Sequence, residues 1–111
     1  MNANKEERAE IVKSGVWLYD DSIEYQVWIV RQNFEYYFEE AYDDSERLNS
    51  DGEVFAVLHA KNGRAISAPK ECFSLEEAVA AAETALPQGI RWDNHRLEKL
   101  EGGRKYLLER D

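Results

Sequence analysis

Residues 53–68, EVFAVLHAKNGRAISA, carry the clearest secondary-structure signal in this chain. In the first eight of these residues both alternating faces are largely apolar, which is typical of a strand buried on both sides of a sheet. Asn62-Gly63 follows, and this dipeptide favours a type I′ turn because both residues tolerate positive φ angles. We therefore predict a β-hairpin whose return strand covers residues 64–68 and ends at Pro69, which cannot donate a hydrogen bond to a neighbouring strand.

Two more strands are predicted upstream of this hairpin. Residues 16–19 are apolar and aromatic, and residues 23–31 alternate, with Ile23, Tyr25, Val27 and Ile29 on one face. The polar triplet Asp20-Asp21-Ser22 between them is typical of a turn, so these two segments should also form a hairpin.

The alternating pattern changes phase after Arg31. Either a bulge near Gln32-Asn33 shifts the register and the strand continues through residues 34–42, or those two residues turn into a new strand. Residues 43–52, DDSERLNSDG, are polar and are expected to form the main irregular loop.

Helices are expected before and after the strands. Asn4 and Glu7 have the spacing of a capping box for a helix over Asn4–Lys13, with Gly15 just beyond its end. Ser74 and Glu77 form a second capping box, preceded by Phe73 as a hydrophobic staple. The apolar face of this second helix contains Leu75, Ala78, Val79, Ala82, Ala85 and Leu86.

The tail begins at Ile90. Ile90 and Trp92 are expected to pack against the core, and Asp93 or Asn94 to cap a short helix that carries Leu97 and Leu100. Gly102-Gly103 would end this helix, and residues 105–108 are either a final strand or a loose end, so the structure of residues 94–111 stays open. Taken together, these elements predict one α+β domain over residues 1–111. It would contain a mostly antiparallel sheet of four or five strands, an N-terminal helix, and a helix after the last hairpin packed on one face.

The composition is that of a folded domain, with 43% hydrophobic and 33% charged residues in 111. Cys72 is the single cysteine, so an intramolecular disulfide framework is excluded. No apolar run approaches the length needed to cross a bilayer, and the first 15 residues lack the apolar stretch of a secretory signal. We therefore expect a cytoplasmic protein.

The net charge of −9 arises within one third of the chain. Between Asp20 and Glu53, eleven acidic residues accompany only two basic ones, Arg31 and Arg47. Aromatic residues are frequent in the same stretch. Such a charge repels phosphates, so nucleic acids and anionic lipid surfaces are not expected as partners.

We find no catalytic, metal or cofactor motif, and we expect a protein that is not an enzyme and needs no cofactor. The positions of Cys72, His59 and His95 in the sequence do not indicate a nucleophile with its base. Residues 49–52 resemble the middle of a calcium loop. However, Arg47 and Leu58 stand where that loop requires oxygen ligands, so the motif is rejected.

The acidic, aromatic segment over residues 35–53 is the predicted binding site for a basic protein. Carboxylates can occupy the positions of phosphates, and the aromatic rings can act as anchors. Trp28 is added as an exposed anchor if its face of the sheet is solvated. The candidate residues are Trp28, Glu35, Tyr37, Glu39, Glu40, Tyr42, Asp43, Asp44, Glu46 and Asp51. The alternative is a solvated sheet edge whose charges prevent aggregation.

In class and composition alone, the chain is similar to bacterial toxin-immunity proteins and phage-encoded inhibitors, which implies occlusion of a partner's cationic site. Two other functions stay open at this point. One is a homo-oligomer, in particular a homodimer, formed when an exposed edge strand pairs with its two-fold mate. The other is a small-molecule-binding module or small enzyme with a cleft between the sheet and the Ser74 helix.

Overall fold

The computed structural model describes residues 6–20, 22–35, 48–67 and 69–100. Within these residues, seven strands form a single sheet, and one helix accompanies it. In chain order the elements are β1 (Ala9–Tyr19), β2 (Ile23–Gln32), β3 (Val54–Lys61), β4 (Arg64–Ala65), β5 (Lys70–Cys72), α1 (Leu75–Ala85), β6 (Arg91–Trp92) and β7 (Lys99–Leu100). All of their pairings are antiparallel.

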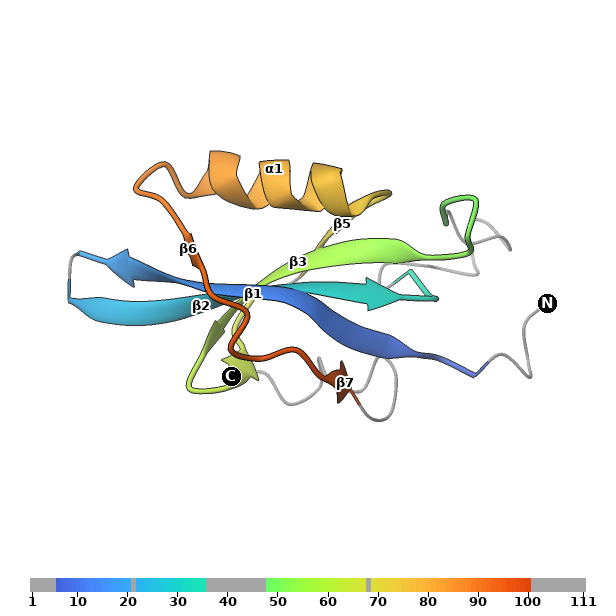
Figure 1. Ribbon diagram of the computed structural model, residues 1–111, viewed down its shortest axis with the longest axis horizontal. Helices are drawn as coiled ribbons and strands as arrows, with labels where there is room; N and C mark the ends of the chain where they lie inside the picture. Colours follow the sequence, from blue (N-terminus) through green and yellow to red (C-terminus); the bar gives the residue numbers. More distant parts are fainter. Residues whose placement is uncertain (1–5, 21, 36–47, 68, 101–111) are drawn as a thin grey trace.

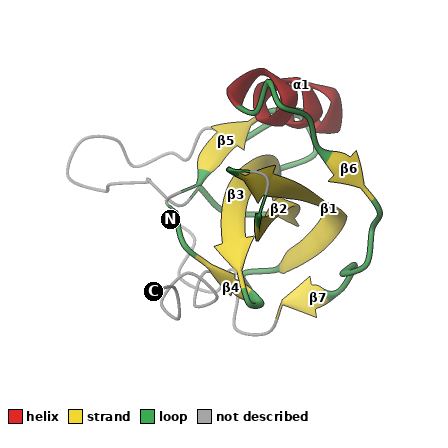
Figure 2. Ribbon diagram, turned by 90° about the vertical axis from the view of Figure 1, so that its left-hand side faces the viewer, coloured by secondary structure: helices red, strands yellow, loops and turns green. Residues whose placement is uncertain are grey.

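The sheet has the order β4-β3-β2-β1-β6, with β5 also on β3 and β7 also on β1. Each outer edge is thus shared by two short strands. Figure 2 shows that the sheet curls strongly, so that the strands surround a common axis. Helix α1 lies along one face of the long β1–β2–β3 strands (Figure 1).

Strand β2 is buried on both faces, and its residues alternate between two apolar clusters. Val27 and Ile29 point to the face beneath α1, which we call the helix side, and pack with Val57, Cys72, Ala78 and Ala82. Trp28 and Val30 point to the opposite face, which we call the far side. The far-side cluster also contains Ala9, Ile11, Phe34, Ala56, Leu58, Ala60 and Ala65.

Arg96 covers the far side. Its guanidinium lies 4.7 Å from the centre of the Trp28 ring, and its Nη1 donates a hydrogen bond of 2.8 Å to the Gly63 carbonyl. Its backbone N–H donates to Ser14 Oγ at 3.1 Å. The connection between β6 and β7 is therefore tied across the sheet to the β3–β4 turn.

Several sequence predictions are confirmed. Asn62 and Gly63 have φ angles of 54° and 80°, as a type I′ turn requires. β1 and β2 form the expected hairpin, with Asp20 at a φ of 54° in its turn. Helix α1 begins after Ser74, whose side chain accepts a hydrogen bond of 3.1 Å from the Glu77 N–H.

The predicted α+β fold with two helices is wrong, because there is no N-terminal helix within the described residues. The residues from Ala9 onward form β1 instead, and Ala9 and Ile11 are buried in the far-side cluster. Pairing along β2 buries these apolar side chains on a sheet, and this gain outweighs the weak local helix preference. The sheet also has more strands than the predicted four or five, because short strands complete both of its edges.

Gly15 is needed for close packing and does not terminate a helix. It pairs with Trp92 of β6, and a Cβ atom built at this position would lie 2.7 Å from the Arg91 carbonyl oxygen and 2.9 Å from Ile90 Cγ2. Only glycine lets β6 approach β1 so closely.

The tail is partly as predicted. Ile90 and Trp92 pack against the helix-side cluster, which confirms their role as anchors. The short helix capped at Asp93 or Asn94 is wrong, because residues 93–98 form no helix and lead into β7, with Asn94 at a φ of 52°. Both Asp93 and Asn94 donate their N–H groups to the Ser14 carbonyl. Within the described residues, α1 is the longest helix at 11 residues, so none has the length and apolarity required to cross a bilayer.

Gly15→Ala should destabilise the protein by about 2–3 kcal/mol, because the added methyl group would lie against the Arg91 backbone and force β6 away from β1. Urea unfolding followed by tryptophan fluorescence measures this change. Gly52→Ala is the matched control: its φ is 76° but nothing lies within 4 Å of the new Cβ, so only the backbone term of about 1 kcal/mol applies. Equal losses in the two variants would contradict the packing role of Gly15.

Candidate functional site

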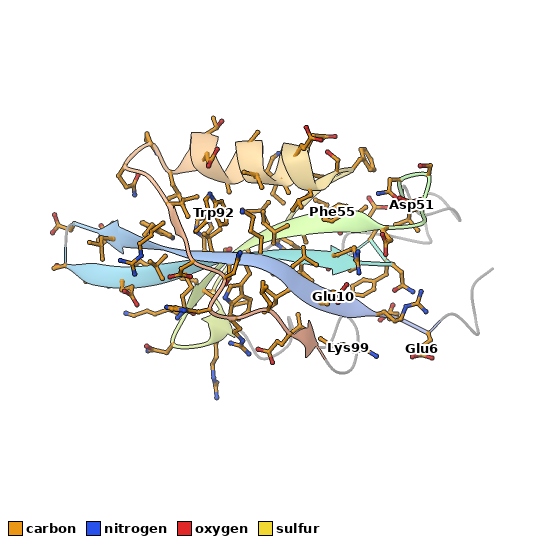
Figure 3. The ribbon with its side chains drawn as sticks, viewed as in Figure 1. Glu6, Glu10, Asp51, Phe55, Trp92 and Lys99 are labelled. Carbon is orange, nitrogen blue, oxygen red and sulfur yellow. The ribbon has the colours of Figure 1, made fainter. Side chains whose placement is uncertain are left out.

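Acidic side chains gather at the end of the sheet where β1 begins and β2 ends. Figure 3 shows Glu6, Glu10 and Asp51 toward this end of the molecule, together with Lys99. The first turn of α1, which begins beside β5, adds Glu76 and Glu77 (Figure 1). We call this region the acidic end. Its described carboxylates are Glu6, Glu7, Glu10, Glu35, Asp51, Glu53, Glu71, Glu76 and Glu77.

A polar groove of about 280 Å³ lies at the acidic end. It is lined by Arg8, Ala9, Glu10, Arg31, Asn33, Glu53 and Lys99. The antiparallel register places Glu10 opposite Arg31, and Glu53 comes directly before β3. Arg31 therefore bridges two carboxylates: it contacts Glu10 closely and lies 3.7 Å from Glu53. All three side chains are partly exposed, so this network positions them but contributes little stability.

Two buried amide side chains fix the chain at this end. Asn33 Oδ1 accepts from the Arg8 N–H at 2.7 Å, and Asn33 Nδ2 donates to the Glu6 carbonyl at 2.8 Å. Gln32 Nε2 donates to the Phe34 carbonyl at 3.0 Å and to Glu71 Oε2 at 3.2 Å. The acidic end thus presents its carboxylates from a rigid frame.

The loop before β3 is held by Asn49. Its Oδ1 accepts from the N–H groups of Asp51 and Glu53, both at 2.9 Å, and its Nδ2 donates to the Phe73 carbonyl at 3.0 Å. The Asn49 oxygen is therefore occupied by backbone donors. The described residues contain no group of three or more side chains able to hold a metal ion.

The predicted site residues divide into three groups. Glu35 and Asp51 lie at the acidic end. The described residues stop there at Glu35 and resume at Leu48. Trp28 is only 3% exposed, so the prediction that it is a surface anchor is wrong: Arg96 and the curled sheet cover its face. The remaining predicted residues lie outside the described residues: Tyr37, Glu39, Glu40, Tyr42, Asp43, Asp44 and Glu46. Residues 36–42 also lie outside the described residues, so the two predictions for the path of the chain after β2 stay predictions.

Sequence analysis missed Arg8, Asn33 and Lys99 as lining residues of the polar groove. They come from three separate segments, and only the pairing of β1 with β2 and β7 brings them together. Each is a common residue in a polar context, so the sequence contains no signal that singles it out.

Cys72 and His59 do not form a catalytic pair. Cys72 pairs with Phe55, four residues before His59 on β3, which places the two residues about 13 Å apart along the strand. Burial raises the pKa of the Cys72 thiol, so it is a poor nucleophile. His95 lies in the tail and contacts Asp93 at 3.4 Å.

His59 belongs to an aromatic cluster on the helix side. The edge of its ring meets Trp17, with centroids 5.6 Å apart, and Trp17 stacks on Tyr25 at 5.0 Å. His59 Nδ1 and Trp17 Nε1 are buried and have no hydrogen-bond partner. Burial lowers the pKa of His59 and keeps its imidazole neutral near pH 7.

Comparison with known proteins gives no relative. No protein-family model matches this chain, and neither a curated protein nor a solved structure is significantly similar to it.

His59 should make the protein less stable as the pH falls below about 6.5, the ordinary pKa that histidine keeps in the unfolded chain. In that range the unfolded state binds a proton that the folded state rejects, so the free energy of unfolding decreases. Above pH 7 this contribution is fully present. Urea unfolding between pH 7.5 and pH 5 should show a smaller decrease for His59→Gln than for the native chain. A decrease that is equally large in His59→Gln and in the native chain would refute the assignment.

Proposed function

We propose that this protein is a non-enzymatic binding protein that docks a basic protein partner at its acidic end. The observation that carries the proposal is the convergence of carboxylates from distant parts of the chain. β1, the segment after β2, the loop before β3 and the first turn of α1 all contribute them at one end of the sheet. The segment over residues 35–53, which contains eight acidic residues and one basic one, begins and ends there.

The clustered carboxylates of the acidic end would attract a cationic partner electrostatically. The potential of clustered carboxylates attracts a cationic surface over distances of about a Debye length, 8–10 Å, and speeds encounter. The rigid frame around Asn33 and Asn49 supports the proposal, since charges that are already positioned lose little freedom on binding. The same charges disfavour nucleic acids and anionic membranes as partners.

An immunity protein or inhibitor is the most specific form of the proposal. Its carboxylates would occlude the cationic active or nucleic-acid site of the partner. The protein would need no cofactor, and the absence of a disulfide framework, with Cys72 alone and buried, favours a cytoplasmic setting. The proposal that the protein is not an enzyme rests on the lack of a catalytic motif in the sequence. It is further supported by the separation of Cys72 from His59.

Two matched variants test this function. The acidic-end variant carries Glu6→Gln, Asp51→Asn and Glu76→Gln, and the hairpin-tip variant carries Asp20→Asn, Asp21→Asn and Glu24→Gln. Each removes the same number of the same charges. A partner is first captured with the native chain from a lysate of the source organism, identified, purified, and then measured against both variants by surface plasmon resonance.

The captured partner should be basic, and the acidic-end variant should bind it about tenfold more weakly, since several rim charges each contribute about 0.5 kcal/mol. The hairpin-tip variant should bind almost as well as the native chain. Added salt should slow association. Equal weakening in both variants, an association rate that does not change with salt, or the capture of no basic protein would overturn the proposal.

A further inference from the structure

The β1–β2 hairpin extends beyond its neighbours at the end opposite to the acidic end. On its outer edge, β1 pairs with β6 only at Gly15 and Val16, and β2 begins to pair with β3 only at Gln26. Residues 17–19 and 23–25 therefore form a two-stranded ribbon with both edges open. Figure 1 shows this ribbon extending past β6 and past the end of α1.

Aromatic side chains pack on one face of the ribbon, but its edges are unprotected. Tyr25 stacks on Trp17 and meets the edge of the Tyr19 ring at 6.1 Å, and Lys61 lies over the Tyr25 ring at 5.4 Å. Natural edge strands usually carry a lysine, a proline or a bulge that deters pairing. The bulge of β1 lies far away, between Ile11 and Lys13, and residues 17–19 contain none of these features.

Apolar side chains are exposed around this edge. Leu18 is 48% exposed, Tyr19 55% and Ile23 39%. A groove of about 530 Å³ runs beside the edge, lined by Val16, Trp17, Leu18, Glu24, Gln88, Gly89, Ile90 and Arg91. It opens beside residues 88–90, which lead into β6, so the backbone groups of β1 beyond Val16 are accessible from the side.

We propose that the open edge of β1 at residues 17–19 pairs with the same edge of a second copy of this chain. In an antiparallel two-fold arrangement centred on Leu18, each Leu18 faces its mate and each Trp17 faces a Tyr19. One continuous sheet then runs through the dimer. The segment is its own complement, as an isologous contact requires.

Charge complementarity fixes the extent of this pairing. Because Arg91 pairs with Val16, β6 begins one residue before the open edge. In the arrangement centred on Leu18, Tyr19 of each copy lies opposite Trp17 of the other. Asp20, the next residue, therefore comes end to end with Arg91, which occupies the position opposite Val16. The Arg91 side chain is 72% exposed and its ion pair with Asp93 is long, at 3.8 Å, so it can turn to the new carboxylate. The symmetry creates this ion pair twice.

The dimer is expected to be weak, because the shared edge is short and each chain carries a charge of −9. It is independent of the proposed function, since it uses the opposite end of the molecule. Either proposal can fail without the other.

A cysteine placed on the two-fold axis tests the register. Leu18→Cys would lie opposite its own mate at the Cα distance of a cross-strand pair, about 4.5–5.5 Å, which a disulfide can span. Leu97→Cys is the matched control, because Leu97 is 52% exposed and lies away from the open edge. The native Cys72 is buried and stays in place in both variants.

Under mild oxidation, Leu18→Cys should form the covalent dimer at least about tenfold faster than Leu97→Cys, because the pairing raises the effective concentration of one thiol near the other. Equal rates would overturn the proposal.

Analytical ultracentrifugation of the native chain provides a second test. The average mass should rise from monomer toward dimer between about 1 μM and about 1 mM, the range in which small interfaces dissociate. Arg91→Glu alone and Asp20→Lys alone should each abolish this rise, and the two together should restore it. A native chain that stays monomeric throughout, as expected if the edge instead receives a strand from another protein, would overturn the proposal. A double variant without rescue would overturn the Asp20–Arg91 contact.

Discussion

The burial of β2 on both faces is the constraint on which the other elements depend. Val27 and Ile29 point to one side and Trp28 and Val30 to the other, so neither face of the strand can be left to water. A single layer of sheet cannot satisfy this requirement. Helix α1 covers the helix side with small alanine side chains that allow close approach. The far side is closed by the curl of the sheet and by Arg96, which spans from the tail to the β3–β4 turn.

The closure of the far side explains why residues 93–98 do not form a helix. Their backbone must run along the edge of β1, where Ser14 and Ile11 bond to residues 93–98, and a helix there would remove these contacts. Gly15 lies at the centre of this contact, because β6 reaches β1 only where no Cβ intervenes. Glycine often follows the end of a helix, but Gly15 instead allows two strands, β1 and β6, to pair closely.

Local signals predicted the elements whose structure is decided locally. The Asn62-Gly63 turn, the Ser74 cap and the alternation of β2 each depend on residues within a few positions of one another. β1 could not be recognised over its first half, because residues 9–13 resemble a short amphipathic helix and only pairing with β2 overrides this preference. The exposure of Trp28 could not be predicted either, since its cover comes from Arg96, far along the chain. The acidic end was partly predictable from charge, but the groove at that end was not, because its residues meet only through the register.

The two surfaces proposed for binding are the two ends of one hairpin. β1 and β2 run almost the full length of a molecule whose longest extent is 47 Å, from the acidic end to the open ribbon. A dimer formed through the ribbons would therefore hold the two acidic ends far apart and facing outward, where they do not repel each other strongly beyond a Debye length. Each acidic end would remain free to meet a basic partner. Such a dimer is bivalent, and a partner that presents two cationic sites would gain avidity from it without any new contact.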